Sequence, residues 1–375
     1  MTPDEAARHH RLAMHNHNRL KIGLFGANCA SGRAVTLVEE RWSGSWDDNL
    51  RLARMADAYG IDFMLPVARW KAYGPIGAYQ AVTLETLTWA AGLLGVTARM
   101  TIFGTVHAPL FNPVLAAKQM VTADHIGHGR FGLNIVVGWN EGEFQMFGVT
   151  QREHEARYRY AQEWLDAIKL IWSAAENFDI DGNFATMRAI RAHPKPFGGT
   201  FPLIMNAGAS GTGRSFATRN CDAFFNVTGS SLAEQAKAVE AAQTEARQYG
   251  KDLDVYTVGV VTCRTTQKEA EEYYHHAFVD RADWVSVDEM LAARNIHADA
   301  LTAAELEEVR RQQATGMGGW RLVGDPDHVA KELAALAGAG LRGIGISLVN
   351  YVEELPLFSE EVLPRLERLG LREAR

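Results

Sequence analysis

The sequence predicts a (β/α)8 TIM barrel, an α/β fold, because strand-like and helix-like segments alternate about eight times along the chain. The length of 375 residues suits one such barrel with an insertion, and no shift in composition marks a boundary between two domains. A doubly wound sheet is the alternative fold. It needs fewer strands and usually carries a dinucleotide-binding glycine pattern after its first strand, which residues 23–32 do not match.

Short apolar runs predict the strands of the barrel. The clearest run, 131–137, is apolar except for Asn134, and the turn Gly138-Trp139-Asn140 would end it. Asn134 must either bond neighbouring backbone or face a polar ligand, because an unpaired buried amide costs about 1 to 3 kcal/mol. The sequence favours neither reading. The expected strands are 21–27, 61–68, 100–106, 131–137, 202–207, 222–227, 255–263 and 343–349.

Apolar residues at helical spacing predict the crossover helices between these strands. Gly60 is a suitable C-cap for the first helix, and Pro113 and Pro326 suit the first turns of two later ones. The expected helices are 46–59, 83–94, 113–126, 153–172, a short helix from Arg214, 232–249, 267–282, 325–338 and a closing C-terminal helix.

Three segments depart from the alternation. Residues 1–20 are polar and predict a flexible N-terminal arm, or one that packs on a partner subunit, ahead of a single domain at 21–375. Residues 178–196 contain aromatic, Gly and Pro residues without helical period and predict an irregular or hairpin excursion. Residues 283–320 are charged and helix-prone, and predict an insertion after the seventh strand. The arm carries four histidines, for which a metal site is the less favoured reading: His9, His10, His15 and His17.

Composition and charge exclude several classes of protein. The formal net charge is −7 and no block rich in Lys or Arg occurs, so we expect no nucleic-acid partner. The three cysteines are widely separated, which supports neither a disulfide framework nor a paired-cysteine metal site. The sequence shows no signal-peptide pattern and no apolar run of the ~18 residues that would span a bilayer. We therefore expect a cytoplasmic protein that binds no membrane.

Polar side chains recur just beyond the expected strands. In a barrel the catalytic groups lie at the carboxyl ends of the strands, so these side chains should meet at one mouth although they are far apart in sequence. The candidates are Asn28, the segment 68–71, Thr105, His107, Asn134, Trp139 and Ser210.

A turn of small residues, 208–213, follows the fifth expected strand and precedes a helix. Backbone N–H groups and the helix dipole favour an anion there, and the Ser210 hydroxyl can bond a phosphate. The same turn could simply connect the strand to the helix without binding a ligand, because small glycine-rich turns are common.

The sequence lacks the residue patterns that several common catalytic mechanisms require. There is no H-E-x-x-H and no G-x-S-x-G pattern, and Glu141 and Glu143 lie on one short turn rather than opposed across a cleft. Neutral polar groups beside an anion-binding turn suit a phosphorylated cofactor that carries the reactivity itself.

Three sequence blocks together resemble those of a known protein family. The blocks GRFGLNIVVGWNEGEFQMFG, HEARYRYAQEWLDAIKLIW and LIMNAGASGTGRSFA occur in this order. They resemble the bacterial luciferase-like flavin monooxygenases, in the branch of pyrimidine oxygenase, dimethylsulfone monooxygenase and alkanesulfonate monooxygenase. The resemblance implies a (β/α)8 barrel, FMN bound as FMNH2 and supplied by a separate NAD(P)H-dependent flavin reductase, and O2 as co-substrate. It also implies a homodimer or homotetramer and a small-molecule substrate.

The resemblance also implies roles for individual residues. Ala68 and Arg69 would lie by the flavin ring, Asn134 and Glu143 on its isoalloxazine or ribityl side, and Thr105 with Asn134 beside the oxygen pocket. The residues implied for the phosphate are Arg157, Tyr158 and Ser210 with the adjoining Gly211.

Some residues match no motif of that branch. His107 could bind substrate, act as acid or base, or be a hydrogen-bonded structural group. Cys29 is expected to be a small buried residue, and Trp139 a wall of the pocket. Three arginines of the insertion region either contact an anionic substrate or carry ordinary surface charge: Arg294, Arg310 and Arg321.

The expected activity is therefore that of a two-component monooxygenase. It would oxygenate a small organic compound through an oxygen adduct at flavin N5 or C4a, and cleave a C–N, C–S or C–halogen bond. The alternatives are a deazaflavin-dependent dehydrogenase and a non-catalytic flavin-binding protein of the same fold.

Overall fold

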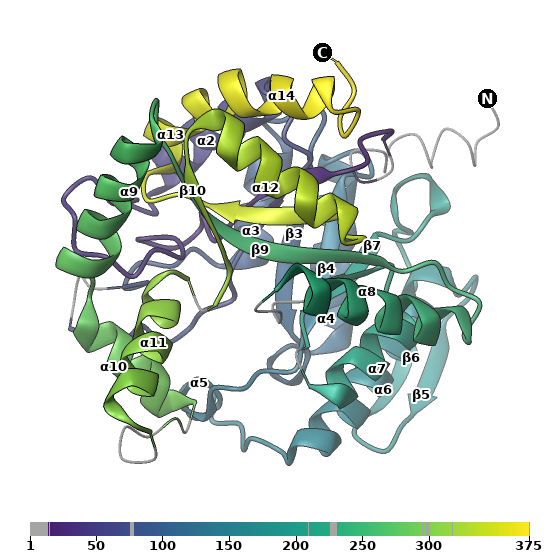
Figure 1. Ribbon diagram of the computed structural model, residues 1–375. Coiled ribbons are helices and arrows are strands. Elements are labelled where there is room, and N and C mark those ends of the chain that lie inside the picture. The colour runs from purple at the N-terminus through teal and green to yellow at the C-terminus, as the bar shows by residue number, and fades with distance from the viewer. Residues whose placement is uncertain are drawn as a thin grey trace.

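The computed structural model describes residues 14, 16–75, 79–208, 210–225, 231–294, 296, 301–316 and 318–374. Eight parallel strands close into a barrel in the order β1-β2-β3-β4-β7-β8-β9-β11, and β11 pairs with β1 (Figure 1). The predicted (β/α)8 barrel is confirmed. The barrel strands are β1 (Lys21–Phe25), β2 (Phe63–Leu65), β3 (Thr101–His107), β4 (Phe131–Val136), β7 (Leu203–Asn206), β8 (Ala223–Phe225), β9 (Asp254–Cys263) and β11 (Gly343–Ser347).

Helices surround the barrel, and several begin at side chains that cap them. Asn112 accepts hydrogen bonds from the backbone N–H groups of Val114 and Leu115, and Asp325 accepts from that of His328. The crossover and C-terminal helices are α2 (Trp46–Ala58), α3 (Thr86–Leu94), α4 (Pro113–Ile126), α6 (His154–Ser173), α7 (Gly211–Asn220), α8 (Leu232–Arg247), α9 (Gln267–His275), α12 (Pro326–Gly338), α13 (Tyr351–Leu357) and α14 (Leu363–Arg368). Short 3-10 or π-helical turns occupy Ala108–Leu110, Phe197–Gly199, His276–Asp280 and Phe358–Val362.

Large aromatic side chains fill the barrel near the amino-terminal ends of its strands. The rings of Phe63 and Phe103 meet edge to face with centroids 6.0 Å apart. Each needs a glycine on the neighbouring strand, because a Cβ on Gly23 would lie 2.2 Å from the Phe63 ring and one on Gly132 would lie 2.5 Å from the Phe103 ring. Since side chains alternate along a strand, the residues that follow Phe103 on the same face of β3 are Thr105 and His107, nearer its carboxyl end.

Three features differ from the sequence prediction or sharpen it. Strand β10 (Trp320–Gly324), at the end of the predicted insertion, was not expected; it runs parallel to the last part of β9. Helix α5 (Glu141–Met146) stands where a turn was expected, and it forms because the Asn140 side chain accepts from the N–H of Gly142. The excursion at 178–196 contains an antiparallel hairpin, β5 (Phe178–Asp181) and β6 (Thr186–Ile190), as one of the two readings proposed.

The insertion forms two helices, α10 (Trp284–Ala293) and α11 (Ala303–Ala314), which pack side by side next to the barrel (Figure 1). An ion pair joins them, with Arg310 Nε 2.8 Å from Asp288 Oδ1. Arg321, on β10, pairs with Glu308 of α11 at 3.0 Å. These two arginines carry ordinary surface charge, one of the alternatives that the sequence left open.

The predicted N-terminal arm is described only at residues 14 and 16–20; His9, His10 and His15 lie outside the described residues. Met14 is buried among the barrel aromatics. The side chains of Asn16 and Asn18 donate to Asp62 at 2.9 and 2.8 Å. This part of the segment therefore packs against the amino-terminal end of β2.

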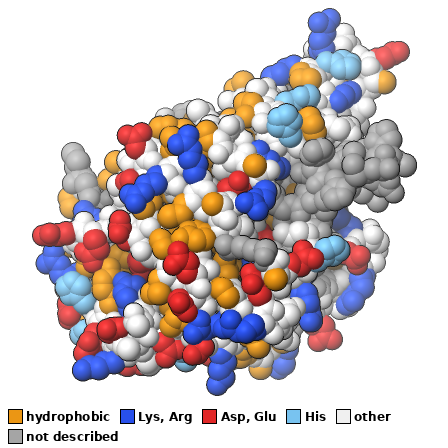
Figure 2. Space-filling model, turned by 90° about the horizontal axis from the view of Figure 1, so that it is seen from above, with side chains coloured by type: hydrophobic (Ala, Val, Ile, Leu, Met, Phe, Trp, Pro, Cys, Tyr) orange, Lys and Arg blue, Asp and Glu red, His pale blue; other side chains and the backbone are white. Residues whose placement is uncertain are grey.

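The surface carries mixed charge. Figure 2 shows acidic and basic side chains interspersed over one face of the molecule, with apolar side chains gathered between them. Within the described part of the chain, none of the helices combines the length and apolar composition that crossing a membrane requires.

Candidate active site

A cavity of about 520 Å³ opens at the carboxyl ends of the barrel strands. This volume lies in the range of small-molecule and cofactor sites. The structure brings together in its wall nine of the residues expected from the sequence: Ala68, Arg69, Thr105, His107, Asn134, Trp139, Arg157, Tyr158 and Ser210. The other expected residues are not among the lining residues: Asn28, Trp70, Lys71, Glu143 and Gly211. Glu143 pairs with the lining residue Arg69, and Gly211 follows the lining residue Ser210 in the chain.

Thr105 and Asn134 face each other from neighbouring strands, where the β3–β4 register pairs them. The Thr105 hydroxyl donates to the Pro66 carbonyl at 2.7 Å and accepts from Asn134 Nδ2 at 3.1 Å. Because the hydroxyl proton is committed to Pro66, the amide group of Asn134 must direct its Nδ2 toward Thr105. Asn134 Oδ1 is buried and has no hydrogen-bond partner among the described residues. A donor bound in the cavity would satisfy it.

A second asparagine, Asn206, ends β7 and also lines the cavity. It donates from Nδ2 to the Ile135 carbonyl at 2.7 Å, and its Oδ1 accepts from the N–H of Gly208 at 2.9 Å. Asn206 thereby fixes the start of the glycine-rich turn. Asn206 was not among the residues expected from the sequence, although it is a polar residue at the end of an apolar strand, the same signal that Asn134 gives.

The glycine-rich turn leads into helix α7. Ser210 is the N-cap, and its hydroxyl accepts from the N–H of Gly213 at 3.0 Å. The Tyr158 hydroxyl lies against the same turn, since a Cβ on Gly208 or Gly213 would be 2.6 or 2.5 Å from its oxygen. The helix N-terminus, with free backbone N–H groups and a positive dipole end, therefore opens beside two hydroxyl groups.

Arg157, from the first turns of α6, supplies positive charge to this end of the cavity. Its Nη1 donates to the Gly138 carbonyl at 2.7 Å, and its buried Nε forms no hydrogen bond with any residue that the structure describes. Ser210, Tyr158, Arg157 and the helix N-terminus together form a cradle that suits a phosphate group.

Arg69 and Glu143 form a buried ion pair, with Nη1 3.0 Å from Oε1. The same oxygen accepts from the backbone N–H of Trp70 at 2.9 Å. Arg69 also donates from Nε to Gln80 Oε1 at 3.0 Å. Glu143 therefore holds Arg69 against the cavity wall from behind, rather than facing the cavity.

His107 lies close to this pair, with Nε2 3.9 Å from Glu143 Oε2, and its buried Nδ1 has no hydrogen-bond partner within the described ranges. Burial lowers the pKa of His107 to about 4, although the Glu143 carboxylate acts in the opposite direction. The imidazole is therefore neutral at pH 7, when it can either donate or accept one hydrogen bond toward the cavity.

Two further arginines line the cavity, Arg33 and Arg294. Arg294 lies over the Trp139 ring at 5.4 Å and donates to Gln313 Oε1 at 3.3 Å. The Arg69 Cζ lies 5.6 Å from the centroid of the same Trp139 ring, so Trp139 contacts both guanidinium groups. The sequence analysis did not select Arg33.

Cys29 and Asn28 lie close to the mouth but have structural roles. Asn28 bonds the backbone of Val67 in both directions, donating to its carbonyl at 2.9 Å and accepting from its N–H at 2.8 Å. Burial raises the pKa of the Cys29 thiol to about 12, so it carries no thiolate at neutral pH.

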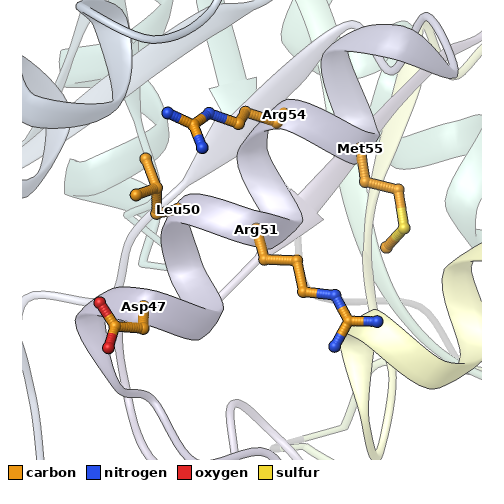
Figure 3. A pocket seen from close by; sticks show the side chains of 5 residues that line it. All are labelled: Asp47, Leu50, Arg51, Arg54 and Met55. Atoms are coloured by element: carbon orange, nitrogen blue, oxygen red, sulfur yellow. The ribbon is translucent and has the colours of Figure 1, made fainter.

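Another hollow lies on the outer surface, along helix α2. Its lining side chains, from Asp47 to Met55, all belong to that helix (Figure 3). It holds no convergent polar groups from different elements, in contrast to the barrel cavity. Among the described residues, no group of three or more His, Cys, Asp or Glu side chains is placed to hold a metal ion.

Comparison with known proteins shows which family the chain belongs to. The family model of luciferase-like monooxygenases matches residues 21–343. The chain belongs to this family. The FMNH2-dependent dimethylsulfone monooxygenase of Pseudomonas putida is 27% identical over 368 residues, covering 93% of this chain and 96% of that protein. Pyrimidine monooxygenase RutA of Allorhizobium ampelinum is 28% identical over 357 residues, covering 92% and 95%. The predicted family and the prediction of a monooxygenase are confirmed.

The fold agrees with solved structures of this luciferase-like family. The crystal structure of DmoA from Hyphomicrobium sulfonivorans superposes with a TM-score of 0.82 at 18% identity, covering 94% of this chain and 89% of that one. At this level of identity the likeness establishes the fold alone.

Proposed function

We propose that this luciferase-like monooxygenase is the oxygenating component of a two-component system that uses FMNH2 and O2. The observation that carries the proposal is the combination of features in one cavity. An anion cradle at Ser210, Tyr158 and Arg157 lies in the same cavity as the buried, unpartnered Oδ1 of Asn134. Relatives named as FMNH2-dependent support the same cofactor.

The residues of the cavity fit FMN. The phosphate would occupy the cradle at the start of α7, where the helix dipole and the charge of Arg157 favour an anion. Asn134 Oδ1 would accept from an N–H group of the reduced ring, which satisfies the orphaned oxygen. Ala68 and Arg69, in the loop that follows β2, would lie along the ring. Bound FMNH2 supplies the electrons that activate O2.

The protein's own groups position the reactants and exclude water. Thr105 orients Asn134, so we assign it a positioning role beside the oxygen pocket, because its only proton is held by Pro66. Neutral His107 faces the same space without adding charge, and its role toward substrate stays a prediction. Apolar walls that include Leu65, Val136 and Phe225 limit the access of bulk water.

The substrate of the proposed reaction is a small organic molecule in which a C–N, C–S or C–halogen bond is cleaved. The relatives' names specify dimethylsulfone and pyrimidine as their substrates, which supports this range. The proposed partner is a separate NAD(P)H-dependent flavin reductase, and assembly as a homodimer or homotetramer stays a prediction.

Anaerobic titration separates this function from its two alternatives. We expect the protein to bind FMNH2 more tightly than a reduced deazaflavin, and the mixture to react with O2 at a rate different from that of free FMNH2. Preferential binding of the deazaflavin with hydride transfer in the absence of O2 would favour the dehydrogenase. Tight FMN binding with no change in the oxygen reaction would favour a flavin-binding protein without catalysis.

A further inference from the structure

The Arg33 guanidinium group lies at the cavity, and two of its nitrogens lack a hydrogen-bond partner in the part of the chain that the structure describes. The residue is 5% exposed, lies in the loop after β1 and lines the cavity. Its Nε and Nη2 are buried, and no described residue forms a hydrogen bond with either of them. Its Cζ lies over the Phe25 ring, 4.6 Å from the ring centroid.

The charge around Arg33 is positive. The cavity wall contains Arg33, Arg69, Arg157 and Arg294, and none of its lining residues in the described part of the chain is Asp or Glu. Arg69 has a counter-charge in Glu143, but no carboxylate within the described residues pairs with Arg33 or Arg294. Burial lowers the pKa of Arg33 to about 10, and the nearby Arg294 and Arg69 add to this effect, so the group remains a cation at neutral pH.

An unpaired buried guanidinium is costly to a fold. Taking an ion out of water without a partner destabilises a protein more than almost any other single group, and an apolar residue of similar length usually avoids that cost. Such groups commonly serve function at the expense of stability. The phosphate cradle has its own cation in Arg157.

We propose that Arg33, with Arg294, forms a subsite for an anionic group of the substrate. This inference rests on the proposed function, since it concerns the molecule that lies beside the flavin. The substrate class is then a small organic anion with a carboxylate, a sulfonate or a comparably delocalised charge. The planar guanidinium offers two parallel N–H donors, which match two oxygens of such a group.

Two pairs of probes with matched shape test the subsite by charge alone. The pairs are methanesulfonate with dimethylsulfone, and benzoate with benzamide. Each is titrated calorimetrically into the protein saturated with FMNH2 without oxygen. We expect each anion to bind at least about tenfold more tightly than its neutral counterpart, and Arg33→Met to remove that preference, a loss of about ten- to hundred-fold. Arg33→Lys should restore part of it.

Two controls distinguish a subsite from a structural effect. Arg321→Met, which removes a surface cation of β10, should leave all four affinities unchanged. Arg33→Met should fold with a melting temperature equal to or above that of the parent, and methanesulfonate or benzoate should raise the melting temperature of the parent but not of this variant.

Several results would overturn the subsite. They are equal affinity for an anion and its neutral partner, no binding of either anion, unchanged affinity in Arg33→Met, or a loss of FMNH2 binding in that variant as large as its loss of anion binding. The last result would assign Arg33 to the flavin. None of these titrations requires turnover, so an absence of oxygenation would contradict the proposed function without deciding the subsite.

Discussion

The Glu143 carboxylate accepts a hydrogen bond from Arg69 at 3.0 Å and a second from the backbone of Trp70 at 2.9 Å. This contact joins helix α5, which follows β4, to the loop that follows β2. The side chains of Arg69 and Glu143 are almost completely buried, with exposed fractions of 5% and 3%. The segment on which Ala68 and Arg69 lie is therefore fixed from outside the cavity by one carboxylate.

We expect substitution of Glu143 to lower stability and cofactor affinity together. Glu143→Ala leaves the Arg69 cation buried without a counter-charge, which should cost about 3–5 kcal/mol of unfolding free energy, measured by urea denaturation. Glu143→Gln keeps the shape and should cost less. Glu141→Gln, at an exposed position of the same helix, is the matched control. An unchanged stability in Glu143→Ala would mean that the pair is not maintained in solution.

Thr105 should act through Asn134. Thr105→Val keeps the shape but removes both the bond to Pro66 and the acceptor for Asn134 Nδ2, so the orientation of the amide is lost. We expect oxygenation to fall about tenfold with more peroxide released, since one hydrogen bond to a reacting group is worth about 1–2 kcal/mol, while FMNH2 still binds. Thr105→Ser should retain most activity. Stopped-flow mixing with oxygen measures the rate of oxygenation in both variants. Product formation at the parent rate by Thr105→Val would show that Thr105 is only a packing residue.

Ser210→Asp isolates the effect of charge in the phosphate cradle. Aspartate is as good an N-cap as serine, so helix α7 should remain intact. A negative charge ~4 Å from the phosphate costs about 4 kcal/mol at an effective dielectric of ~20, against ~1 kcal/mol for a lost neutral hydrogen bond in Ser210→Ala. Titration with FMNH2 should therefore show a much larger loss for Asp than for Ala. Equal affinities of Ser210→Asp and the parent would place the phosphate elsewhere.

His107 should make stability depend on pH. Burial lowers its pKa from 6.5 to about 4, so the unfolded chain binds the proton more readily. The stabilisation is complete above pH 6.5 and is lost as pH falls from 6.5 toward 4, by up to about 3 kcal/mol. His107→Asn should reduce the difference between the free energies of unfolding measured at pH 7 and at pH 4.5. His17→Asn, at an exposed site, should leave this difference unchanged. Parallel pH profiles for His107→Asn and the parent would show that the imidazole is not buried in its neutral form.

Much of the barrel and part of the site could be predicted because the signals are local. Apolar runs and helical spacing specify the strands and crossover helices, and parallel strands bring Thr105 and Asn134 to the same level. Ser210 was predictable for the same reason, since a turn of small residues before a helix has the same meaning in any fold.

The remaining features depend on distant contacts. Nothing in the loop after β1 indicates that Arg33 turns inward, because its burial is decided by Phe25 and by the residues around Gly316. The position of Glu143 behind Arg69 follows from helix α5, which sequence spacing did not reveal. Strand β10 is five residues long and forms by pairing with β9, a partner more than fifty residues away.

The most direct test of the central claim is the fate of molecular oxygen. The protein is supplied with FMNH2 by a separate flavin reductase under heavy-isotope O2, with a panel of sulfones, sulfonates, pyrimidines, amides and halogenated aromatics, and the products are analysed by mass spectrometry. The account predicts one labelled oxygen atom in the product of at least one compound, and a loss of that label in Asn134→Ala. Label found only in peroxide and water, with every compound recovered unchanged, would contradict it.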